Sequence, residues 1–260
     1  MPAAATAADR TGWRRQLRRL RKRTLPILLV VEALGVFAVT PLIELKLLPR
    51  ESLGVTLILI LALGMLSLQQ RAWIGRLLVV LGAILLPIQV WRYVAPGALI
   101  LVLHPLGTIL FLVLISWALT DTLFRSQRIS LHQVMGGVVL YLNVGLTFAL
   151  AYTLVEHVMP GALSLPPPGP DKPVHPTYFA YFSFATLTTV GYGDTIPVSP
   201  VARSLAMLEA TLGQLFPAII LARLVSIELA DREQRLRAKE QRAERKAHQH
   251  APERHGPGRS

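Results

Sequence analysis

Six long apolar runs, separated by short polar segments, constrain the fold of this chain more than any other feature. They cover residues 25–45, 53–68, 73–93, 98–119, 134–155 and 201–227. A helix of about 20 apolar residues is long enough to cross the hydrocarbon core of a bilayer. Hydrophobic residues make up 52% of the 260 positions, which agrees with a bilayer as the main solvent. The sequence therefore predicts an all-α membrane protein with six transmembrane helices.

The basic residues favour one orientation and one kind of partner. The net charge is +12, and lysines and arginines gather in both terminal tails and beside the ends of apolar runs. Cytoplasmic segments carry an excess of Lys and Arg, so both termini of this multi-pass protein are expected on the cytoplasmic side of the cell membrane. The basic ends are expected to bind anionic lipid headgroups and not nucleic acid.

Two other observations narrow the class of protein. The chain has no cysteine, which excludes disulfides, thiolate metal sites and thiol catalysis. The first apolar run follows a basic stretch, so a signal peptide is the alternative there. That run is longer than a usual signal core, and no small-residue cleavage site closes it, so a membrane span is expected.

The segment between the fifth and sixth runs has the composition of a re-entrant loop, because it is too polar to span and too apolar for an ordinary surface loop. It should begin as a helix at Pro176, since proline suits a first helical turn, and end near Thr188. The next residues are Thr189-Val190-Gly191-Tyr192-Gly193, followed by Asp194. Glycine permits backbone angles that a Cβ disfavours. Such angles let successive carbonyl oxygens turn to one side, where they can replace the water shell of a potassium ion.

The motif Thr-Leu-Thr-Thr-Val-Gly-Tyr-Gly-Asp at 186–194 resembles the pore of prokaryotic six-span potassium channels. Gly213-Gln214-Leu215 and Ala222-Arg223-Leu224 are similar to the inner helix of that family. The resemblance implies passive potassium conduction by a homotetramer, since four filter strands are needed to ring an ion. It implies no enzymatic activity and no cofactor beyond permeant potassium ions. The implied selectivity filter is Thr189, Val190, Gly191, Tyr192 and Gly193, and the first four of these residues build the potassium sites.

Three other functions are alternatives. A weakly selective cation channel would share the fold, although Tyr192 argues against it. A non-conducting membrane sensor would carry no current. A potassium-uptake transporter needs four pore loops in one chain, whereas this chain has one.

The predicted organisation has four parts. Residues 1–24 form a basic cytoplasmic tail, 25–132 a four-helix membrane domain, 133–227 the pore domain, and 228–260 a polar, helical cytoplasmic tail. Within the first run, Glu32 is expected to pair with a base such as Arg76. The fourth run contains no Arg or Lys. Voltage sensors carry arginines along such a helix, so gating by voltage is not expected.

The residues predicted to support the filter are Asp194, Thr188, Tyr181 and Glu209. The hydroxyl of Tyr181 is expected to reach Asp194; the alternative is that Asp194 faces water at the mouth. Glu209 lies inside the sixth run, where a carboxylate is costly and usually functional or paired. A hydrogen bond from a pore-helix hydroxyl such as Thr186 or Thr188 is expected, and a position in a watery crevice is the alternative.

Two further features concern movement and packing. Gly213 and Pro217 are candidates for a gating hinge, because glycine lowers the cost of bending and proline removes a helical hydrogen bond. Adaptation to helix packing is the alternative for both. The rings of Tyr181, Phe182 and Phe184 are expected to form a collar around the filter.

Overall fold

The structure is a computed structural model, and it describes residues 24–49, 51–67, 72–94, 97–125, 131–165 and 176–249. Of the predicted N-terminal tail only Thr24 lies inside these ranges, and residues 250–260 of the C-terminal tail lie outside them. In the described ranges the regular structure is helical apart from one two-stranded ladder.

Helices occupy all six predicted apolar runs. The first covers Thr24–Glu44 and contains the π-helical segment η1 (Gly35–Val39) and then α2 (Thr40–Glu44). The others are α3 (Glu51–Ser67), α4 (Ala72–Val94), α5 (Ala98–Arg125), α6 (Leu131–Val158) and α8 (Pro200–Gln249). Five of these segments are long and apolar enough to cross a membrane, and α3, with 17 residues, is a shorter apolar helix. This part of the chain therefore supplies five candidate spans and one short apolar helix.

A short helix and the ladder lie between α6 and α8. Helix α7 (Pro176–Leu187) begins at the predicted proline. Strand β1 (Leu163–Ser164) pairs antiparallel with β2 (Ile196–Pro197). The ladder thus fastens the chain that follows α6 to the chain that precedes α8, and it closes a loop around α7.

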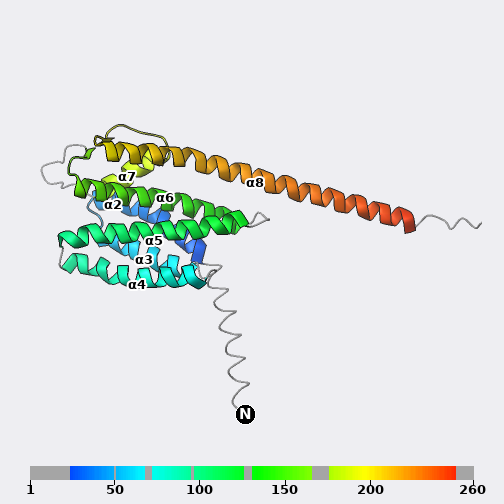
Figure 1. Ribbon diagram of the computed structural model, residues 1–260, viewed down its shortest axis with the longest axis horizontal. Coiled ribbons are helices and arrows are strands. Elements are labelled where there is room, and N and C mark those ends of the chain that lie inside the picture. The colour runs from blue at the N-terminus through cyan, green and yellow to red at the C-terminus, as the bar shows by residue number, and fades with distance from the viewer. Residues whose placement is uncertain are drawn as a thin grey trace, which may run out of the picture.

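Two large apolar cores and a third, smaller cluster around Phe184 hold the helices together. Helix α3 packs against the first span and α4, α5 packs against α4 and along α6, and α7 packs against α6 and α8 (Figure 1). The most buried residues of the first core include Leu28, Leu61, Leu78, Phe111 and Val139. The second core includes Tyr152, Leu163, Phe182 and Ala202. Because α6 contributes to both cores, it connects the four-helix part with the segment around α7.

Helix α8 has 50 residues and extends far beyond the rest of the bundle (Figure 1). At 1.5 Å per residue its length is about 75 Å. Its apolar part, Pro200–Ala230, is the candidate span, and its polar part continues to Gln249. Pro217 lies inside this helix without ending it.

Glu32 is fully buried in the first span, and neither of its carboxyl oxygens has a hydrogen-bond partner among the described residues. The predicted pair with Arg76 is therefore wrong. Leu28 and Val36, one helical turn to either side, pack into apolar clusters. Within the described residues, the neighbours of Glu32 one turn away on this helix thus lie among apolar side chains.

Candidate functional site

The backbone after α7 turns its N–H groups back toward that helix. The N–H of Thr189 donates to the carbonyl oxygen of Thr186 at 2.9 Å. The N–H groups of Val190 and Gly191 both donate to the carbonyl oxygen of Ala185, at 2.9 and 3.1 Å. No described residue donates to the carbonyl oxygens of residues 189–193. The segment therefore fixes the first three of its donors on one side and leaves its acceptors free.

The backbone angles of this segment alternate. Thr189, Gly191 and Gly193 have φ values of 61°, 54° and 78°, whereas Val190 and Tyr192 do not have positive φ. A left-handed residue at every second position lets successive carbonyl oxygens face the same side. A Cβ on either glycine would meet nothing within 4 Å, so conformation and not space requires glycine there. Positive φ at both glycines agrees with the motif, and the left-handed Thr189 was not predicted.

Side chains of this segment are uncovered in the single chain. Val190 and Tyr192 are 53% and 72% exposed. Irregular backbone at membrane depth is tolerated only where it is buried in protein or lines water. In the single chain, the side chains of Val190 and Tyr192 therefore lack such protein cover.

Tyr181 of α7 braces the outer end of the segment. Its ring stacks on that of Tyr192, with centroids 6.1 Å apart and planes 10° from parallel. Desolvation and the nearby carboxylate of Asp194 raise the pKa of Tyr181 to about 12. Asp194 is exposed, and the hydrogen bond expected between Tyr181 and Asp194 stays a prediction.

Glu209 is fully buried behind the segment and joins three helices. The hydroxyl of Tyr152 on α6 donates to Oε2 of Glu209 at 2.7 Å. The hydroxyl oxygen of Ser183 on α7 lies 2.5 Å from Oε1 of Glu209 and 2.7 Å from the carbonyl oxygen of Gly145. The predicted kind of contact, to a pore-helix hydroxyl, is present, but the predicted partners were wrong.

The hydrogen bonds around Glu209 can be compared with the number of hydrogens available to make them. Its three oxygen–oxygen contacts need three hydrogens, and the hydroxyls of Tyr152 and Ser183 supply two. The Ser183 hydroxyl has one hydrogen and lies within hydrogen-bonding distance of two acceptors, Oε1 of Glu209 and the carbonyl oxygen of Gly145. A neutral Glu209 that donates to Ser183 and accepts from Tyr152 would satisfy all three contacts.

Three other predicted residues of the pore helix make contacts away from Glu209. The hydroxyl of Thr188 donates to the carbonyl oxygen of Phe184 at 2.6 Å and so completes the end of α7. The ring of Phe182 packs on Tyr152, with centroids 4.8 Å apart. The ring of Phe184 packs on Phe37 of the first span at 5.9 Å. Tyr181 stacks on Tyr192 of the filter segment, and the aromatic collar stays a prediction.

Gly213 of α8 packs directly on the end of α7. A Cβ at this position would lie 1.9 Å from the carbonyl oxygen of Leu187, which is closer than any real contact. The hydroxyl of Tyr141 donates to the same oxygen at 3.2 Å. A close approach of two backbones thus accounts for Gly213. The hinge role of Gly213 and Pro217 stays a prediction.

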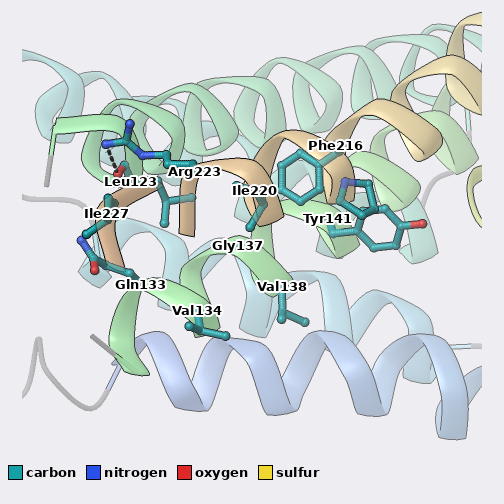
Figure 2. A pocket seen from close by; sticks show the side chains of 11 residues that line it. Leu123, Gln133, Val134, Gly137, Val138, Tyr141, Phe216, Ile220, Arg223 and Ile227 are labelled. Carbon is teal, nitrogen blue, oxygen red and sulfur yellow. Dashed lines mark hydrogen bonds between the residues drawn. The ribbon is translucent and has the colours of Figure 1, made fainter. Parts of the chain in front are cut away.

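Below this contact a cavity of about 230 Å³ separates α6 from α8 (Figure 2). The rings of Tyr141 and Phe216, 5.7 Å apart, lie at one end of it. At the other end the guanidinium of Arg223 donates to the carbonyl oxygens of Leu123, at 3.3 Å, and Phe124. These are terminal carbonyls of α5, where a cation complements the helix dipole. Arg223 therefore ties α8 to the four-helix part.

Sequence reasoning missed several of these contacts. The missed residues are Tyr141, Tyr152 and Ser183. The contact between Gln214 and Thr189, which is described below, was also missed. Polar side chains inside apolar segments were the available signal. Among the described residues, no group of three or more His, Cys, Asp or Glu side chains could hold a metal ion.

Comparison with known proteins identifies similar chains. The family model described as "Ion channel" matches residues 145–228. The inward rectifier potassium channel Kirbac3.1 of Paramagnetospirillum magnetotacticum is 36% identical over 84 residues, which cover 31% of this chain and 24% of that protein. Protein LctB of Bacillus caldotenax is 34% identical over 103 residues, which cover 38% of this chain and 75% of LctB. LctB of Geobacillus stearothermophilus is 49% identical over 45 residues, 33% of its length. No solved structure matches significantly.

Proposed function

We propose that this chain, which belongs to the ion-channel family, conducts potassium ions passively across the cell membrane through a tetrameric pore. As an ion channel it is not an enzyme. The observation that carries the proposal is the backbone of residues 189–193, with left-handed angles at alternate positions and N–H groups bound back to α7. Potassium gives up its water only where oxygens at similar spacing replace it.

The proposed potassium sites are built by Thr189, Val190, Gly191 and Tyr192, and Gly193 completes the filter. Tyr181, Asp194, Thr188 and Glu209 are proposed to support it from α7 and α8. The name of the similar Kirbac3.1 protein, an inward rectifier potassium channel, favours potassium as the permeant ion.

The proposed assembly is a fourfold homotetramer in which four filter strands ring the ion. The exposed filter residues of the single chain favour this, because a lone strand at membrane depth leaves its acceptors uncovered. We propose that α3 also crosses the bilayer, since its 17 residues reach the lower end of spanning length. Six crossings then place both termini in the cytoplasm, where the basic residues of 1–24 and 228–260 meet anionic lipid.

Potassium flux into liposomes that contain purified protein tests the proposal. Gly191→Ala should abolish the flux, because a Cβ disfavours the φ of 54° on which the carbonyl alternation depends. Gly161→Ala is the matched control: its φ is 83°, a Cβ there also meets nothing within 4 Å, and it lies outside the filter. That control should keep the flux. Normal flux through Gly191→Ala would contradict the proposed filter.

A further inference from the structure

A side-chain hydrogen bond connects the inner helix to the innermost residue of the filter segment. Nε2 of Gln214 donates to Oγ1 of Thr189 at 3.1 Å. Gln214 interrupts an apolar stretch of α8, and both side chains are exposed in the single chain. The bond therefore lies on the uncovered side of the chain and not in either apolar core.

Gly213, the residue before Gln214, fixes the position of Gln214 along the pore axis. Gly213 approaches the carbonyl oxygen of Leu187 so closely that a Cβ would lie 1.9 Å from it. Leu187 is the last residue of α7, and the filter segment follows at once. The next residue of α8 is thus held level with the inner end of the filter.

The chemistry of the two groups determines what the bond can do. A threonine hydroxyl has one hydrogen and two lone pairs. The N–H of Gln214 occupies one lone pair of Oγ1, so the other can face an ion. Thr189 also has a left-handed φ of 61°, a costly conformation for a residue with a Cβ that persists only where the surroundings hold it. The amide restrains the side chain of a residue whose backbone is already strained.

We infer that Gln214 is a positioning residue for the innermost potassium site: its amide holds Oγ1 of Thr189 toward the ion path, and its polar end lines the entrance below the filter. This inference rests on the proposed function. Gln214 makes no second hydrogen bond within the part of the chain that the structure describes. Four such amides in the tetramer would form a polar ring in an otherwise apolar cavity wall.

Block by barium from the cytoplasmic side tests the inference, because barium is close to potassium in size and occupies potassium sites without passing quickly. Gln214→Met keeps the length of the side chain and removes the amide. The affinity for internal barium should fall about three- to tenfold, which corresponds to the net free energy of one neutral hydrogen bond. Single-channel potassium conductance should also fall, while potassium remains preferred over sodium.

A double-mutant cycle separates positioning from a general change of the cavity. In a Thr189→Ala background, Gln214→Met should have no further effect on barium affinity, because the acceptor is already gone. Leu221→Met is the matched control. It is exposed and lies seven residues later, on the same face and about 10 Å farther along α8. It should leave barium block unchanged.

The possible results distinguish this inference from the proposed function. Absence of potassium current from the wild-type protein would overturn the proposed function, and the inference with it. Selective wild-type current together with unchanged barium block and conductance in Gln214→Met would overturn the inference alone. An equal effect of Leu221→Met, or additive effects in the cycle, would also overturn it.

Discussion

Adding a single methyl group at Gly213 should disrupt the pore. In Gly213→Ala the new Cβ would lie 1.9 Å from the carbonyl oxygen, 2.8 Å from the carbonyl carbon and 3.1 Å from the Cα of Leu187. Ordinary contact begins at 3.4 Å, so the oxygen contact is short by about 1.5 Å. All three neighbours are backbone atoms, and none can rotate away. Helix α8 must therefore move away from the end of α7.

That movement has a calculable effect on the filter. The bond between Gln214 and Thr189 is 3.1 Å long, and a shift of about 1.5 Å takes it beyond hydrogen-bonding distance. Overpacking of this kind costs about 1–3 kcal/mol per site. Because the proposed tetramer contains four such sites, Gly213→Ala should lower its resistance to heat strongly and should reduce potassium flux.

Gly137→Ala supplies the comparison. Gly137 lies on α6 at the cavity, and a Cβ there meets nothing within 4 Å. Alanine in place of glycine within a helix gains up to about 1 kcal/mol. This variant should form a tetramer at least as heat-resistant as the wild type, as measured by size-exclusion chromatography after heating in detergent. Equal heat resistance and equal flux in the two variants would refute the packing argument. A stable Gly213→Ala tetramer with only its open probability changed would favour a hinge instead.

Three further predictions concern the inner helix and the membrane domain. Glu209→Gln should keep the heat resistance of the tetramer, since an amide can donate to Ser183 and accept from Tyr152, whereas Glu209→Leu should cost about 1–3 kcal/mol per subunit. Equal losses in the two variants would contradict a neutral Glu209. Pro217→Ala should straighten α8 and shift open probability without changing selectivity; an unchanged open probability under every tested stimulus would exclude the hinge. Conductance–voltage curves should be shallow, because residues 98–119 contain no Arg or Lys. A curve so steep that several elementary charges must move across the membrane during gating would contradict this prediction.

The helices and the filter backbone were predictable from local sequence. Apolar runs placed the five candidate spans and the short apolar helix within three residues of their bounds, and Pro176 marked the start of α7. The glycines at 191 and 193 have the positive φ that the motif requires. These features depend on residue type and near neighbours, which a sequence displays directly.

Contacts between distant helices were less predictable, because they depend on how each helix is rotated. The rotation of α7 directs Ser183 to Glu209, whereas the hydroxyl of Thr188 returns to its own helix. The same rotation buries Phe182 and Phe184 against other helices of the chain. No pattern of neighbouring residues in the sequence indicates the apolar surroundings of Glu32 or the close approach of two helices at Gly213.

The reversal potential of purified protein in a planar bilayer tests the central proposal most directly. With potassium chloride on one side and sodium chloride on the other, a pore of dehydrating carbonyl oxygens should reverse far from zero, in the direction set by potassium. Gly191→Ala, purified in the same way, controls for contaminating channels and should carry no such current. A wild-type reversal potential near zero would contradict potassium selectivity and favour a weakly selective cation channel. Absence of any wild-type current would contradict conduction itself.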